Sequence, residues 1–254
     1  MQKILVARPI FPDVIDRLKR YFDVDWNNGE ALAPEALHQR LADKDGALTA
    51  GDPIGAAALA AAPRLRVVSN MAVGYNNFDM AAFNALNVLG TNTPDVLNET
   101  TADFGWALMM AAARRIAESE HWLRAGQWRK WSYDGFLGSD LYGSTLGVIG
   151  MGRIGQALAR RAKGFNMQVI YHNRSRVAPE IEAELNAQYV SRQDLLRRAD
   201  HVVLTPHIAS ATEATRRAMA NLAADNLIAA LGEGPRAGQP PNPINPDVMG
   251  KARS

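Results

Sequence analysis

Residues 144–176 read STLGVIGMGRIGQALARRAKGFNMQVIYHNRSR and decide the fold. An apolar run at 146–149 enters a glycine turn made by Gly150, Gly152 and Gly155, and an amphipathic helix follows. Gly150 permits a tight turn, Gly152 leaves room for a phosphate beside the backbone, and Gly155 allows the helix to pack closely on the strand. The positive end of the helix then faces the phosphate. This order predicts a dinucleotide-binding domain. The alternative is a glycine turn that has only a structural role.

The loop after the second strand of this domain indicates which dinucleotide binds. NAD-binding proteins place an acidic residue there for the ribose 2′-hydroxyl, whereas this chain has Asn173, Arg174, Ser175 and Arg176. Arginine pairs with a phosphate, and serine donates a hydrogen bond to it. The loop predicts NADP(H) rather than NAD(H), with a solvated basic loop as the alternative. The predicted cofactor-binding residues are Gly150, Met151, Gly152, Arg153, Ile154, Gly155, Asn173, Arg174 and Ser175.

Composition limits the classes of protein that the chain resembles. The chain has 254 residues, of which 47% are hydrophobic, enough for two modest cores. Because 28 Lys and Arg nearly balance 26 Asp and Glu, no nucleic-acid partner is expected. The absence of cysteine excludes disulfides and thiolate metal sites, and no metal site is predicted. The apolar runs at 4–7 and 107–113 are too short for a signal peptide or a membrane span, so we expect a cytoplasmic protein without a membrane partner.

The first 94 residues alternate short apolar runs with amphipathic stretches, which predicts a small parallel α/β domain of the flavodoxin type. One apolar run at 66–69 leads into NMAVGYNNFD, so a glycine follows a predicted strand. Ligands of open α/β sheets gather at such strand ends. The backbone amides of Val73 and Gly74 are expected to form an anion-binding nest for a carboxylate. An ordinary turn is the alternative.

A long helix is predicted over residues 99–126, opened by a capping box of Thr100 and Asp103 and ended by Gly126. It connects a substrate domain of residues 1–98, completed by residues 213–254, to a dinucleotide-binding domain of residues 127–212. Four tryptophans lie in or just after this helix: Trp106, Trp122, Trp128 and Trp131. So many aromatic residues favour a protein interface, and we expect a homodimer. Packing between the two domains is the alternative.

Three motifs in order, VGYNNFD, GMGRIG and TPHIASAT, resemble the D-isomer-specific 2-hydroxyacid dehydrogenases. The resemblance is strongest to the NADPH-dependent glyoxylate/hydroxypyruvate reductases. It implies hydride transfer from NADPH to a small 2-oxo acid, which gives a 2-hydroxy acid. By this resemblance His207 is the acid/base, Val73 and Gly74 hold the substrate carboxylate, and Ala209 stands where the family has a glycine at the nicotinamide.

Two further family motifs are absent: an Ala-Arg-Gly that holds the substrate and a Gly-Leu-Asp-Val-Phe-Glu whose glutamate supports the histidine. A predicted short helix at 193–198 and a predicted third strand at 201–204 run directly into the segment that contains His207. The interval after Gly155 is too short for a six-stranded domain, so a segment on the order of 70–90 residues is missing. We therefore expect a truncated doubly wound (Rossmann) domain. The competing function is a non-catalytic NADP-binding or dimerising remnant.

Overall fold

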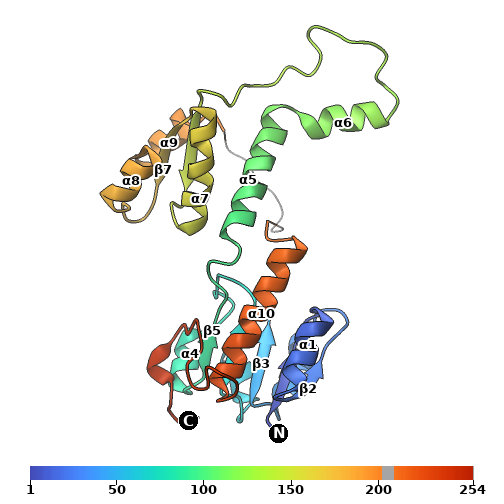
Figure 1. Cartoon of the computed structure of the whole chain (residues 1–254), viewed down its shortest axis with the longest axis vertical. Helices are drawn as coiled ribbons and strands as arrows, with labels where there is room; N and C mark the ends of the chain where they lie inside the picture. The colour runs from blue at the N-terminus through green and yellow to red at the C-terminus, as the bar shows by residue number, and fades with distance from the viewer. Residues whose placement is uncertain (202–208, 254) are drawn as a thin grey trace. The chain divides into compact units, whose positions relative to one another are not determined.

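The computed structural model describes residues 1–201 and 209–253, which form two compact units (Figure 1). Unit 1 combines Met1–Val96 with Glu213–Ser254, and unit 2 comprises Leu97–Thr212. The C-terminal segment therefore belongs to the same unit as the N-terminal one. The long helix expected to connect two domains lies in unit 2.

Unit 1 is built on a five-stranded parallel sheet in the order β2-β1-β3-β4-β5. This is the flavodoxin-like order, and it confirms the α/β prediction made from alternating apolar runs. The strands are β1 (Lys3–Val6), β2 (Asp23–Trp26), β3 (Gly46–Thr49), β4 (Val67–Asn70) and β5 (Leu89–Thr91).

Helices cover both faces of this sheet, so successive strand residues are buried on opposite sides. In β1, Ile4 and Val6 join the core that includes α1 and α10, whereas Leu5 joins the core that includes α2, α3 and α4. The elements are α1 (Pro12–Lys19), α2 (Pro34–Leu41), α3 (Ala56–Ala60), α4 (Met80–Ala85), α10 (Glu213–Ala230) and the short 3₁₀ helix η2 (Pro246–Val248).

The C-terminal helix α10 packs closely on β3 and β4. A Cβ on Gly46 would approach Leu227 Cδ1 to 2.9 Å, so a glycine is needed for this contact. The buried Ser69 hydroxyl donates to the Ala223 carbonyl at 2.8 Å. These contacts explain why residues so distant in sequence complete the first sheet.

Unit 2 contains a smaller parallel sheet, with the order β6-β7-β8 among the described residues. His201 forms an isolated parallel bridge to Leu146 in β6. The elements are α5 (Asn98–Ala113), α6 (Ile116–Arg124), β6 (Thr145–Ile149), α7 (Arg153–Ala162), the 3₁₀ helix η1 (Lys163–Phe165), β7 (Gln168–His172), α8 (Pro179–Leu185), β8 (Ala187–Tyr189) and α9 (Arg192–Arg198).

The sequence analysis missed β8, which is the third strand of unit 2. His201, expected to begin the third strand, pairs with β6 rather than β7 or β8. The winding direction therefore changes at β6, as it does at the ligand-binding switch point of doubly wound sheets. Residues 202–204 of the predicted strand lie outside the described residues.

The prediction of one helix over 99–126 is wrong, because α5 ends at Ala113 and α6 begins at Ile116. Arg115 between them has a left-handed backbone with φ of 51°. The Ala113 carbonyl accepts a hydrogen bond from the Ser139 N–H at 2.9 Å, so a distant segment caps α5.

The predicted capping box is also wrong. Helix α5 already begins at Asn98, and Asp103 lies within it. The Asp103 carboxylate accepts a hydrogen bond at 2.9 Å from Arg161 Nε in α7, and Glu99 accepts one from the same guanidinium. These acidic residues therefore fix α5 to α7.

Candidate dinucleotide and substrate sites

The glycine turn between β6 and α7 has the geometry of a phosphate cradle. Gly150 has φ of 103°, in the left-handed region that favours glycine. A Cβ on Gly155 would overlap the Gly150 carbonyl oxygen, so the close approach of α7 requires glycine. A Cβ on Gly152 would meet no atom within 4 Å, which leaves the space beside the turn open. The turn therefore fits a phosphate group.

Asn173 holds this turn from the end of β7. Its side-chain oxygen accepts a hydrogen bond from the Met151 N–H at 2.7 Å, and its carbonyl accepts one from the Tyr189 hydroxyl at 3.2 Å. The Met151 side chain is buried in the core of unit 2. Met151 and Asn173 were both predicted to bind the cofactor, and the hydrogen bond between them positions the turn. Tyr189, whose ring also stacks on His172, was not predicted.

The first turn of α7 presents donors to the open side of the cradle. Arg153 begins the helix and is exposed, and Ile154 is half-buried. The amides of Gly152 and Ile154 have no acceptor in the described part of the chain. Unpaired amides and the positive dipole end attract anions, and no acidic residue lies in this first turn.

The two arginines after β7 differ in their availability. Arg174 and Ser175 are exposed and make no hydrogen bond or ion pair with any described residue. Arg176 instead donates to both carboxylate oxygens of Glu182, at 2.8 and 2.6 Å. The Arg176 guanidinium and then the Tyr171 hydroxyl lower the pKa of Glu182 to about 2. Arg176 is thus held by Glu182, and the contact of Arg174 with a 2′-phosphate stays a prediction.

The loop after β4 in unit 1 is held through its carbonyl groups. The Ala72 carbonyl accepts from the Thr93 N–H at 2.9 Å. The Val73 and Gly74 carbonyls accept from the side-chain amides of Asn92 at 2.8 Å and Asn70 at 2.9 Å. The Val73 and Gly74 N–H groups have no acceptor among the described residues. The loop thus presents two adjacent donors, as an anion nest requires.

Buried polar side chains connect this loop to the one after β3. The Asn70 side-chain oxygen accepts from the Gly51 N–H at 3.0 Å, and Asn77 donates to the Asp52 carbonyl at 2.8 Å. Asp52 is buried and pairs with Arg8 at 2.8 Å. These supporting residues were not predicted, because their partners are distant in sequence.

A cavity of about 360 Å³ lies at this carboxyl edge of the sheet of unit 1. Its walls are largely apolar, and they include Met71, which directly precedes the loop. Arg8 and Arg216 add positive charge to it. Arg216 is exposed and makes no hydrogen bond or ion pair within the described residues. The arrangement suits a small carboxylate with an apolar group.

The remaining predicted site residues lie near the end of unit 2. His207, the predicted acid/base, is outside the described residues, whereas Ala209 occupies a half-buried turn. No group of three or more potential metal ligands occurs in the described parts of the chain. Within the same parts, no helix is long and apolar enough to cross a membrane.

Comparison with known proteins places this geometry in a family. Residues 106–229 match the model of the D-isomer specific 2-hydroxyacid dehydrogenase, NAD binding domain. The glyoxylate reductase of Thermococcus kodakarensis is 43% identical over 217 residues, which cover 83% of this chain and 65% of the relative. This chain thus spans slightly less than two thirds of that relative.

Other relatives match nearly the whole chain. The glyoxylate reductase of Thermococcus litoralis is 32% identical over 329 positions, covering 97% of this chain and 98% of the relative. At least 75 of those positions (329 against 254 residues) have no counterpart here. A solved Thermus thermophilus structure has a TM-score of 0.84 and 30% identity, covering 96% of this chain and 100% of that one. As its motifs predict, the chain belongs to the D-isomer specific 2-hydroxyacid dehydrogenase family.

Proposed function

We propose that the chain binds NADP(H) and reduces a small 2-oxo acid, of the glyoxylate or hydroxypyruvate type, to the 2-hydroxy acid. The observation that carries this proposal is the open glycine cradle followed by Arg174, which is unpaired among the described residues. The curated relatives are named glyoxylate reductases, which supports the substrate class. A reducing, cytoplasmic setting is part of the proposal because the chain has no cysteine.

Each part of the chain has a distinct task in this reaction. The amides at the start of α7 hold the pyrophosphate, and Arg174 pairs with the 2′-phosphate. The Val73 and Gly74 amides hold the substrate carboxylate. NADPH, when bound, supplies the hydride for the carbonyl carbon. His207 donates the proton to the carbonyl oxygen, a role that suits an imidazole near neutral pH.

A second candidate function is NADP(H) binding without turnover. The chain contains no arginine followed by glycine, and at least 75 positions of the Thermococcus litoralis alignment (329 against 254 residues) are missing. The family arginine and glutamate are therefore absent. Loss of even one preorganised donor lowers kcat about 10²–10³-fold. We expect turnover at least ~10³-fold below that of an intact relative.

The test combines binding and turnover on the full chain. NADPH binding is measured by fluorescence, and its oxidation is followed with glyoxylate and with hydroxypyruvate. Slow oxidation that disappears in His207→Ala supports the reductase. Binding with no oxidation above a no-protein control supports the remnant. A chain that neither binds NADPH nor oxidises it contradicts both functions.

We also propose a homodimer formed through the aromatic segment after α5. Trp131 is 72% exposed and Tyr133 is 87% exposed, in a stretch without helix or strand after α6 (Figure 1). Trp122, at the end of α6, is partly exposed as well, whereas Trp106 is buried against Phe165. Large exposed aromatic groups of this kind are typical of protein interfaces, and a second copy of the chain offers the same surface in return.

A further inference from the structure

Unit 1 has a second cavity, of about 490 Å³, at the amino edge of its sheet. Its walls include Arg66 and Leu89, where β4 and β5 begin, and the segment that follows η2. The loop of Val73 and Gly74 follows β4 at the opposite, carboxyl edge. A volume of this size lies in the range of ~300–1,000 Å³ found for small-molecule sites.

Among the described residues, the cavity is lined by three cationic ones, Arg66, Lys251 and Arg253, and by no acidic one. The side chains of Arg66 and Lys251 are exposed and make no hydrogen bond or ion pair with any described residue. Three like charges around one cavity repel one another, and a bound anion removes that repulsion. Leu89, Val248 and Met249 add an apolar wall.

Arg253 is half-buried and has no carboxylate partner among the described residues. Its guanidinium donates to the carbonyls of Leu86 at 2.9 Å and Leu59 at 2.8 Å, near the ends of α4 and α3. Its Nε is buried and has no hydrogen-bond partner. Burial lowers the pKa of the Arg253 guanidinium. Backbone carbonyls thus orient this cation and leave its charge unneutralised.

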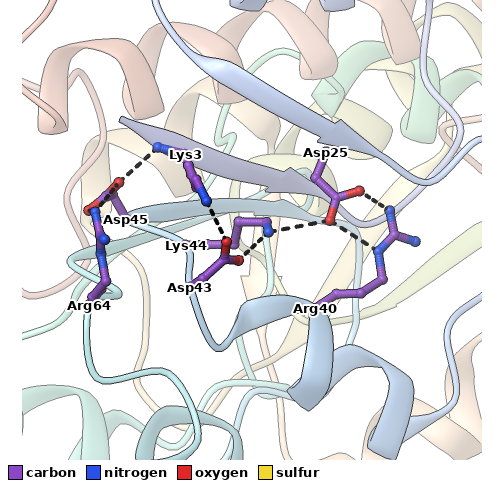
Figure 2. A network of polar contacts seen from close by, with 7 residues as sticks. All are labelled: Lys3, Asp25, Arg40, Asp43, Lys44, Asp45 and Arg64. Atoms are coloured by element: carbon purple, nitrogen blue, oxygen red, sulfur yellow. Dashed lines mark hydrogen bonds and ion pairs between the residues drawn. The ribbon is translucent and has the colours of Figure 1, made fainter. Parts of the chain in front are cut away.

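Four other cations of unit 1, Lys3, Arg40, Lys44 and Arg64, are all paired, as Figure 2 shows. Lys3 meets Asp43 at 2.8 Å, and Arg64 meets Asp45 at 3.0 Å. Lys44 and Arg40 both pair with Asp25. Arg64 is therefore paired, while Arg66, two residues later, is not. Unpaired positive charge therefore gathers at this cavity, whereas the cations in Figure 2 are neutralised.

We infer that this cavity binds a small polyanion, a phosphate- or carboxylate-bearing molecule with at least two negative charges. The fork of an arginine matches both groups. The site lies within unit 1 and contains none of the residues assigned to NADP(H) or to the 2-oxo acid. Its occupation is therefore independent of the proposed reaction.

The experiment titrates the full chain with pyrophosphate and with citrate, using calorimetry and the shift in Tm. The test variant is Arg66→Gln with Lys251→Gln, and Arg64→Gln is the matched control. Wild type and control are expected to bind alike and to show Tm rising with ligand concentration. Binding by the double variant is expected to be at least ~10-fold weaker, because charge-assisted hydrogen bonds are lost.

Two results would overturn the inference. The first is no measurable binding of either anion by the folded wild type. The second is equal binding by all three proteins. Such binding would not depend on Arg66 and Lys251, so it would show pyrophosphate held at the glycine turn, or an adventitious ion only. A preference for pyrophosphate or for citrate identifies the group that the site recognises. Circular dichroism verifies that the variants fold, as expected for exposed side chains.

Discussion

Replacement of Arg174 by aspartate tests the cofactor assignment most directly. The side chain is exposed and makes no hydrogen bond or ion pair with any described residue, so its replacement breaks no such contact there. Within the proposed complex it meets the 2′-phosphate, which NADH lacks. Aspartate both removes the cation and repels that phosphate. The change therefore acts on one cofactor and spares the other.

The expected magnitude follows from the type of contact. A hydrogen bond to a charged group contributes about 1.5–3 kcal/mol, which corresponds to about ten- to a hundredfold in affinity. Because Arg174 is exposed, solvent screens the pair, and we expect the lower part of that range at physiological salt. NADH affinity is expected to stay unchanged or to improve. The difference between cofactors is expected to shrink as salt rises.

The assay is a fluorescence titration with NADPH and NADH at low and high ionic strength. Arg176→Ala serves as a matched control, because Glu182 already holds that guanidinium at 2.6 Å. The control is expected to bind NADPH within about twofold of wild type, since an exposed ion pair contributes little. Equal weakening of both cofactors by Arg174→Asp would refute the assignment, and so would a larger loss in Arg176→Ala.

Three further outcomes are expected. Glu182 and Asp43 have folded pKa values of about 2, depressed from 4.5 and 3.8, so they stabilise the fold above those ordinary values. Stability is expected to fall as the pH drops from about 4.5 toward 2, and urea unfolding of Glu182→Gln is expected to show a weaker acid dependence than wild type. The smaller described sheet of unit 2 leaves Ile149 56% exposed, so unit 2 is expected to be prone to unfolding or aggregation. In hydrogen exchange, β6 is accordingly expected to be less protected than β1. Uniform strong protection of unit 2 in a monodisperse, cofactor-free sample would contradict this expectation. Substitution of both Trp131 and Tyr133 by glutamate is expected to convert the wild-type dimer to a monomer in sedimentation velocity. A double variant that stays as dimeric as the wild type would exclude this segment as the interface.

Local patterns predicted most of the fold. The five strands of unit 1 follow from short apolar runs whose alternate residues are buried on opposite faces, and parallel pairing follows from the helices between them. The strand β8 was missed because Ala187–Tyr189 has three residues and carries no apolar run. The break after α5 was missed because Ser139, far along the chain, caps it.

In the candidate sites too, features formed by contiguous residues were predictable, whereas contacts between residues distant in sequence were not. The glycine turn was predictable because strand, turn and helix are contiguous in sequence. The supports of the Val73 loop were not, since Asn92 reaches it from after β5. The pairing of Arg176 with Glu182 in α8 distinguishes two arginines that look equivalent in the sequence. Spacing alone does not predict such competition between partners.

In the proposed function, cofactor binding and substrate reduction depend on different parts of the chain, so one can be retained when the other is lost. The cradle, Asn173 and Arg174 all lie on β6, α7, β7 and the loop that follows, a contiguous stretch that contains every feature of the half-site. The alignment with the Thermococcus litoralis relative reaches 98% of that protein, so the positions without a counterpart are internal. Because the arginine and glutamate motifs of the family are absent, we infer that this gap lies after His201, beyond the switch point at β6. Under the proposal, the missing part is the one that would orient the substrate and support His207, whereas the residues proposed to hold a 2′-phosphate are present. Measured NADPH affinity close to that of an intact relative, together with strongly reduced turnover, is the combination that this division of the sheet predicts.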